Sequence, residues 1–144
     1  MRLHHVRPII ALAAASRLDA QAPATGPAAA ANASTTSADV QEMKAALRAL
    51  VMKQEAFWSE HGSYTSDMSA LGLYPRPASA GGTPAVQVIF AGSRGWTGMA
   101  TQNSMKGASC VVFVGRPDEL PKLPATIRSK VVPTVEAGPV CDER

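Results

Sequence analysis

Large side chains recur every three or four positions between residues 38 and 60, and most of them are apolar. They form one stripe: Val40, Met43, Leu47, Leu50, Gln54 and Phe57. This spacing places them on one face of an α-helix, whereas the charged residues of the same stretch fall mostly on the other faces. The pattern predicts an amphipathic helix over about 38–60, whose stripe packs against the core and partly against partner helices.

The ends of this helix are also marked in the sequence. Thr36 or Ser37 can cap its start, and Asp39 and Glu42 would place negative charge in its first turn. Gly62 follows the last apolar position and is typical of a helix C-terminus.

Apolar and polar positions are arranged differently after the helix. A short apolar helix or turn is predicted over Met68 to Leu73, followed by three runs typical of strands: Val86 to Ala91, Trp96 to Thr101 and Cys110 to Val114. Short glycine-containing connections between these runs favour antiparallel pairing. Five prolines after Gly115 predict an irregular C-terminal region, in which Thr126 to Val132 could add an edge strand.

These elements predict one α+β domain over residues 37–144. Its long N-terminal amphipathic helix would pack on a three- to four-stranded antiparallel meander, and a disulfide would close the irregular C-terminal region.

The first 36 residues follow another pattern. Arg2 and Arg7 precede a short apolar run and then small residues, which is typical of a signal peptide over residues 1–22. A bilayer-spanning helix requires about 20 apolar residues, so we expect no stable membrane anchor after signal cleavage. Residues 23–36 lack large apolar side chains and predict a flexible linker. The alternative is a disordered alanine-rich start of a cytosolic protein.

The cysteines bear on this choice. Cys110 and Cys141, the two cysteines of the chain, stand 31 positions apart. This spacing does not match a Cys-x-x-Cys metal or redox pair. In an oxidising compartment the pair predicts a structural disulfide, and we expect a periplasmic or secreted protein.

The charge of the chain does not indicate a particular kind of partner. The formal net charge is +3, and the basic residues are spread singly rather than clustered. Nucleic-acid binding usually requires a concentrated basic surface, so we expect no nucleic-acid partner.

Several short motifs occur in an order that is similar to type IV pilins and type II secretion pseudopilins. The helix leads into Gly62-Ser63-Tyr64 and then Leu71-Gly72, and the later pieces are Gly95-Trp96-Thr97-Gly98, the Cys110 strand and Pro139-Val140-Cys141-Asp142. Over about residues 38–143 the chain resembles the globular head of these proteins. The resemblance implies a non-enzymatic protein that contacts other pilin or pseudopilin subunits or envelope proteins.

The N-terminus departs from this family. Pilins carry a prepilin leader and a helix of about 20 apolar residues that anchors the subunit. Neither is present before Val40. Polymerisation by the usual route is therefore in doubt.

Other candidate sites are weak. The lone His61 at the helix end is suited to interact with the helix dipole, and no catalytic or cofactor motif surrounds it. Asp118 and Glu119 lie in a loop comparable to one that holds calcium in some pseudopilins, but two adjacent carboxylates are a weak signal for calcium and a solvated turn is the simpler explanation. Tyr74, among prolines, is the best candidate for an exposed contact.

We therefore expect a pilin-like subunit or accessory of a type IV pilus or type II secretion-type filament. The alternative is a stand-alone secreted or periplasmic binding module that reuses the same fold. We expect no enzymatic activity and no cofactor.

Overall fold

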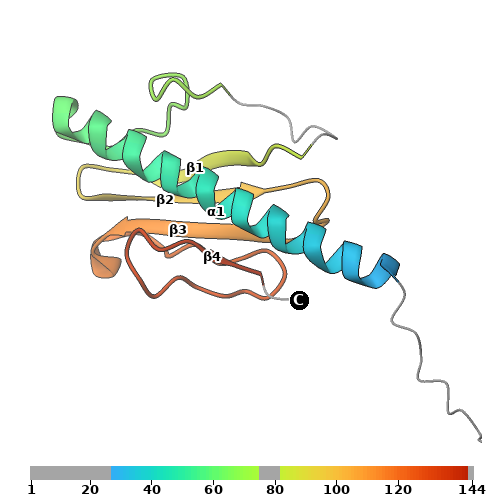
Figure 1. Cartoon of the computed structure of the whole chain (residues 1–144). Helices are drawn as coiled ribbons and strands as arrows, with labels where there is room; N and C mark the ends of the chain where they lie inside the picture. The colour runs from blue at the N-terminus through green and yellow to red at the C-terminus, as the bar shows by residue number, and fades with distance from the viewer. Residues whose placement is uncertain (1–26, 75–81, 143–144) are drawn as a thin grey trace, which may run out of the picture.

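The computed structural model shows an α+β domain with one helix lying across one face of a four-stranded antiparallel sheet (Figure 1). It describes residues 27–74 and 82–142, with side chains described from residue 37. The predicted signal peptide, residues 1–22, lies outside the described residues. The elements are α1 (Pro27–His61), β1 (Ala85–Ala91), β2 (Gly95–Thr101), β3 (Ser109–Gly115), the short 3-10 helix η1 (Pro117–Glu119) and β4 (Val140–Cys141).

Helix α1 begins earlier than the predicted start near residue 38. Residues 27–36, which we predicted to belong to a flexible linker, are helical. Their sequence explains the difference, because alanine has the highest helix propensity and proline is well suited to the first helical position. The predicted cap at Thr36 or Ser37 is therefore wrong, and Asp39 and Glu42 lie in the interior of the helix.

The other end of the helix lies close to its predicted position. The helix ends at His61, and the Gly62 amide donates a hydrogen bond of 2.8 Å to the Trp58 carbonyl. Gly62 has a φ of 67°, a left-handed conformation that residues with a Cβ adopt at a cost. After it, residues 68–72 form turns rather than a regular helix.

The sheet has the order β1-β2-β3-β4, and every neighbouring pair is antiparallel. The first three strands include the predicted runs, each with one or two added residues. The β1–β2 register shifts between Val88 and Phe90, whereas β2 and β3 pair without interruption.

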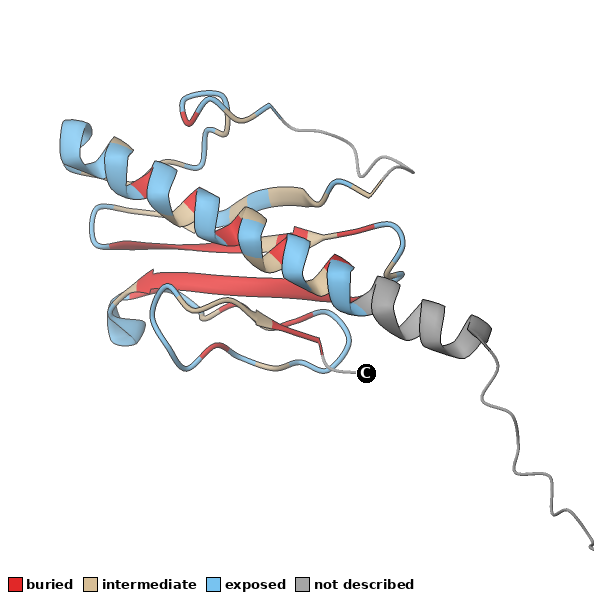
Figure 2. Ribbon diagram, in the orientation of Figure 1, coloured by how far each residue is buried: buried red, intermediate tan, exposed pale blue. Residues whose placement is uncertain are grey.

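The core lies between α1 and the middle of the sheet (Figure 2). Leu47 and Leu50 from the helix meet Trp96 of β2 and Val112 of β3, all less than 2% exposed. Gly98 makes this close approach possible, because a Cβ there would lie 2.8 Å from the Trp96 ring and 3.2 Å from Leu50 Cδ2. The helix thus packs on the sheet at a position without a side chain.

The C-terminal region differs in one respect from the prediction. Thr126 to Val132, a possible edge strand, contains a turn instead, and the Thr126 amide bonds the Val131 carbonyl within it. The fourth strand is β4, the two residues Val140–Cys141, paired with Val111 and Cys110 of β3. The proline-rich segment before it therefore pairs with the sheet as a strand only at its end.

Candidate functional site

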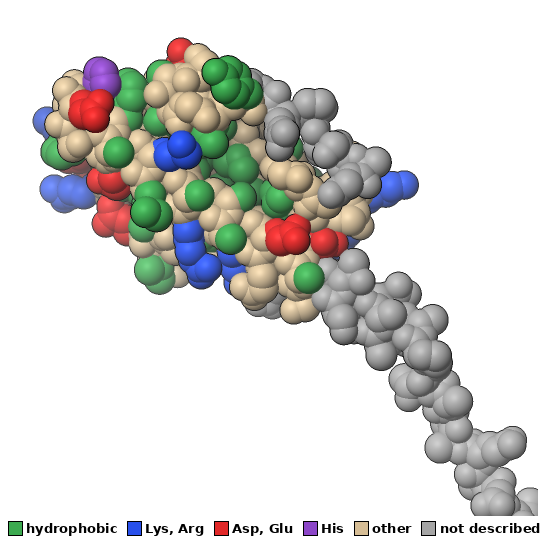
Figure 3. Space-filling model, turned by 45° about the horizontal axis from the view of Figure 1, so that its top comes forward, with side chains coloured by type: hydrophobic (Ala, Val, Ile, Leu, Met, Phe, Trp, Pro, Cys, Tyr) green, Lys and Arg blue, Asp and Glu red, His purple; other side chains and the backbone are tan. Residues whose placement is uncertain are grey.

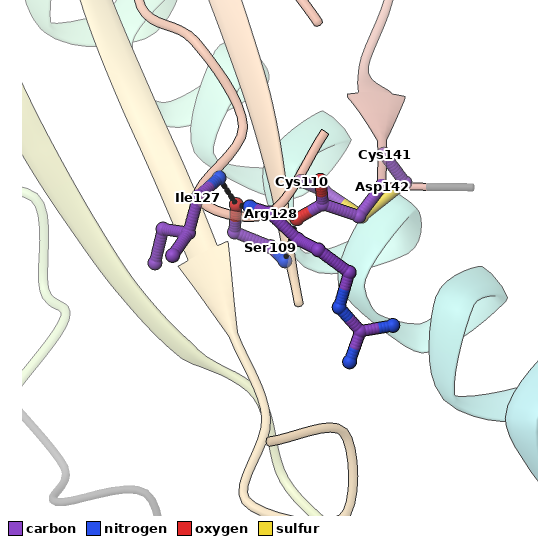
Figure 4. The surroundings of a disulfide bond; sticks show 6 residues. All are labelled: Ser109, Cys110, Ile127, Arg128, Cys141 and Asp142. Atoms are coloured by element: carbon purple, nitrogen blue, oxygen red, sulfur yellow. Dashed lines mark hydrogen bonds between the residues drawn. A yellow bond between two sulfur atoms is a disulfide. The ribbon is translucent and has the colours of Figure 1, made fainter. Parts of the chain in front are cut away.

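The predicted disulfide is confirmed. Cys110 on β3 and Cys141 on β4 are directly opposite in the strand register, and their Sγ atoms are bonded (Figure 4). Closing a loop of this length stabilises a fold by about 3–4 kcal/mol in the chain-entropy account. Disulfides are typical of proteins that fold outside the reducing cytosol.

Asp142, next to the disulfide, holds the C-terminal segment to the sheet. Its carboxylate accepts hydrogen bonds from the Ser109 amide at 2.8 Å, the Ser129 amide at 2.6 Å and the Arg128 amide at 3.2 Å. Ser109 Oγ in turn accepts a bond of 2.8 Å from the Ile127 amide (Figure 4). We call the disulfide together with these Asp142 contacts the C-terminal clasp.

Electrostatics fit this role of Asp142. The residue is only 6% exposed, and burial by itself would raise its pKa. Hydrogen bonds from Ser129, Thr126, Ser109 and Arg128 outweigh that effect and hold the pKa well below the usual range of a carboxyl group. Asp142 is therefore an acceptor-only, charged group at neutral pH. This role of Asp142 was not predicted from the sequence, in which the signal was an acidic residue directly after the second cysteine.

The turn after the helix is also built by buried polar contacts. Gln54, fully buried on α1, donates to the Thr65 carbonyl at 2.6 Å and accepts from the Thr65 amide at 3.1 Å. Tyr64 donates a hydrogen bond of 3.0 Å to the Glu55 carboxylate. The pKa of Tyr64 is raised to about 12, mainly because the side chain is partly buried and also because Glu55 is acidic. The turn after the helix is thus attached to α1 by the side chains of two consecutive residues, Gln54 and Glu55.

The predicted helix stripe faces the protein's own core. Met43, Leu47 and Leu50 are at most 1% exposed, and Val40 and Phe57 are partly buried against the same cluster. The first three therefore present no surface to another protein. Over residues 37–61, a contact through α1 has to use residues other than these three.

The side of α1 opposite to these three residues is open over the described residues. We call it the outer helix face and define it by four exposed residues: Ala45, Ala49, Met52 and Ala56. Met52 is 73% exposed and is the largest apolar side chain of this face. Figure 3 shows a face of the molecule on which hydrophobic side chains lie between acidic and basic ones.

An apolar hollow of about 250 Å³ lies between α1, the turn after it and the start of β1. Leu50, Met68, Leu73 and Val86 contribute to its walls, and Tyr74 lies at its edge. Tyr74 is 79% exposed, as expected for a candidate contact residue.

The remaining candidates take part in local contacts. Glu119 pairs with Arg94 at 3.3 Å, and Asp118 pairs with Arg116 at 3.4 Å, so both predicted calcium candidates have basic partners on the surface. His61 stacks on Phe57 with 4.0 Å between ring centroids and contacts the Phe57 carbonyl. Among the described residues, no three His, Cys, Asp or Glu side chains form a group suited to a metal ion.

Two further findings concern the kind of protein that this chain is. Within residues 27–74 and 82–142, no helix combines the length and apolarity needed to cross a bilayer. No protein-family model matches the chain, and a search of curated proteins gives no significant match.

Proposed function

We propose that this chain is a non-enzymatic, pilin-like protein that works outside the cytoplasm. It would act as a subunit or accessory of a type IV pilus or a type II secretion-type filament, through contacts with pilin, pseudopilin or other envelope proteins.

The combination of the helix, the sheet order and the clasp is the observation that supports this proposal. One helix lies across a four-stranded antiparallel sheet, and the last strand is linked to its neighbour by Cys110–Cys141. The resemblance of the sequence to pilin heads implies this arrangement. Two glycines of these motifs are also needed by the fold. Gly62 ends the helix in a left-handed conformation, and Gly98 leaves room for the Trp96 ring.

The outer helix face is the surface on which we base the test. Filament subunits contact one another through helices in the family that the chain resembles, and the buried stripe of α1 is already used internally. Met52, at the centre of the outer helix face, is therefore the residue to change.

Co-sedimentation with sheared surface filaments tests the proposal. Tagged wild-type protein should pellet with filaments from cells that carry a type IV pilus or a type II secretion system. Met52→Glu should reduce the pelleted fraction at least tenfold, whereas Ile89→Glu, on exposed β1, should leave it unchanged. Wild-type protein that stays in the supernatant with filaments present would contradict the proposal.

Export is tested separately. Mass spectrometry of the protein from native cells should show a mature N-terminus near residues 16–23. An intact Met1 would contradict the extracytoplasmic location.

A stand-alone binding module is the second candidate, and the apolar hollow favours it. Its volume of about 250 Å³ and its apolar walls are suited to a small apolar ligand rather than to a filament. Saturable binding of an apolar fluorescent probe, lost in Leu73→Asp but retained in Met52→Glu, together with no filament co-sedimentation, would favour this function.

A further inference from the structure

Strand β1 forms one edge of the sheet and is less covered than its neighbours. It is the first strand in the sheet order and pairs with β2 on one side (Figure 1). No residue of β1 is buried, whereas most residues of β2 and β3 are (Figure 2). Proteins often protect an exposed edge strand with charged residues or proline, and Ala85–Ala91 contains neither.

The outward backbone groups of β1 have no partner in the described part of the chain. In an antiparallel ladder, alternate residues direct both N–H and C=O to the same neighbouring strand, and the residues between them direct theirs away from it. No described segment other than β2 forms a backbone hydrogen bond with Ala85–Ala91. Backbone N–H and C=O groups require partners, and at a free strand edge these are water or a further extended chain.

The regular part of this edge lies beside the apolar hollow described above. β1 and β2 pair in step over residues 85–88, and the register shift comes after them. Ala85 and Val86 line the hollow from the sheet, and Ala46 and Ala49 line it from α1. The free edge of β1 and the hollow are therefore parts of one surface.

A strand added to β1 would direct side chains into the hollow. Neighbouring strands lie about 4.8 Å apart, and the side chains of paired residues point to the same face of the sheet. Val86 packs against the core on the side of α1, so every second residue of the added strand would point to this side. There it would meet the apolar walls formed by Leu50, Met68 and Leu73. The residues between would lie near Ile89, which is 50% exposed.

We propose that β1 and the hollow bind an extended peptide segment of a partner protein, which adds to the sheet as a fifth strand. Hydrogen bonds to the β1 backbone would hold the segment, and its apolar side chains at alternate positions would fill the hollow. Main-chain bonds give affinity and side-chain pockets give specificity in this mode of peptide recognition. The site goes beyond both functions proposed above and does not rest on the contact through Met52.

The dimensions of the surface favour a peptide over a second copy of the domain. A stable interface between two folded domains usually buries roughly 800 Å² on each of them. The regular part of the β1 edge, residues 85–88, is too short to supply this. The hollow of about 250 Å³ is bounded by α1, by β1 and by the turn that contains Leu73, so it has space for a few side chains.

Selection from a library of short random peptides tests the site. Full-length wild-type protein should select peptides in which apolar residues recur at every second position. A selected peptide with a fluorescent label should bind at least tenfold more weakly to Ala49→Leu, whose longer side chain takes up space in the hollow. Ala56→Leu makes the same change on the same helix outside this hollow and should bind like wild type.

Both alanines are exposed, so both variants should fold. Failure to select any peptide would overturn the proposal, as would equal binding by Ala49→Leu and Ala56→Leu. The protein alone should sediment as a monomer. A dimer that the peptide dissociates would assign the β1 edge to a second copy and would also overturn the proposal.

Methylation of the peptide's backbone nitrogens separates strand addition from binding by side chains alone. A methyl group removes the hydrogen with which an amide bonds a β1 carbonyl. Methylation at every second position should therefore weaken binding at least tenfold, whereas methylation at the positions between should leave it unchanged. If a methyl group is tolerated at every position, the hollow binds an apolar group without the β1 backbone, and the proposal is wrong.

Discussion

The domain has two regions that are held in different ways. Residues 37–74 and 82–115 bury a continuous apolar layer, in which Leu47 and Leu50 pack on Trp96 and Val112. Residues 116–142 contain only a short 3-10 helix and a two-residue strand as regular structure. Cys141 and Asp142 link their end to β3, and the Ala137 and Ile127 amides also donate hydrogen bonds to β3. The first region is held mainly by nondirectional burial, whereas the second adds one covalent bond and directed hydrogen bonds to the burial of a few side chains, such as Leu120 and Pro133.

This difference has consequences for cooperativity. A segment that buries fewer large apolar side chains than the core gains less from the hydrophobic effect and opens more readily. The clasp counteracts this by fixing the far end of the segment beside β3. The two regions should therefore respond differently to core mutations, reduction and acid.

The largest effect is expected from the core. Leu47→Ala removes a side chain that is 0% exposed and should lower the free energy of unfolding by about 2–5 kcal/mol, through lost burial and the cavity left behind. Urea unfolding followed by circular dichroism measures this loss. Met52→Ala, on the exposed side of the same helix, is the control and should change stability by less than about 0.5 kcal/mol. Similar losses in both variants would contradict the packing of α1 described here.

Removal of the disulfide should come next. The double variant Cys110→Ala and Cys141→Ala should lose about 3–4 kcal/mol. Hydrogen exchange should rise first at backbone amides of the C-terminal segment, such as Ala137, which bonds the Phe113 carbonyl. Amides in the middle of α1 should keep their protection until global unfolding. Equal loss of protection in both regions would show that the segment has no separate opening.

Asp142 should contribute less than the disulfide. Asp142→Asn replaces the carboxylate that accepts from the backbone amides of residues 109, 128 and 129 by a weaker, neutral acceptor. The free energy of unfolding should fall by about 1–3 kcal/mol at neutral pH. Thermal melts measure the loss, and Asp67→Asn, at an exposed turn, is the matched control.

Acid should remove the same contribution. The pKa of Asp142 is lower in the folded protein than its unfolded value of about 3.9. Its stabilisation is therefore complete above that value and is lost as the pH falls toward the lower, folded pKa. The difference in stability between wild type and Asp142→Asn should narrow below about pH 4. A difference that stays constant into acid would contradict the role of the charge.

The smallest effect concerns the turn after the helix. In a Tyr74→Phe background, absorbance at 295 nm reports Tyr64, which should ionise near pH 12. Glu55→Gln should lower this midpoint only in part, because burial is the largest cause of the shift. A wild-type midpoint near 10 would contradict the Tyr64–Glu55 contact.

The sequence was a good guide to the regular elements. The stripe from Met43 to Leu50 indicated the helix by its period of three to four, and three short apolar runs between glycine-containing connections indicated β1 to β3. It was a poor guide to the start of the helix, since Ala28 to Ala31 have high helix propensity but no apolar periodicity.

The contacts of the candidate sites could likewise be predicted from the sequence only in part. The pairing of Cys110 with Cys141 could be predicted, because the chain has two cysteines. The contacts of Asp142 with Ser129 and of Gln102 with Asp39 could not, because they join residues 13 and 63 positions apart. Periodicity in the sequence does not indicate contacts between residues so far apart.

By itself, then, the sequence determined the element types, the buried stripe of α1 and the disulfide, which follow from local periodicity and from the cysteine count. Only the tertiary structure decided which strand would follow β3 at the sheet edge, which acidic residue would be buried, and which carboxylates would share the Gln102 amide. These depend on where distant segments meet, and that is set by the packing of the whole chain rather than by any local pattern.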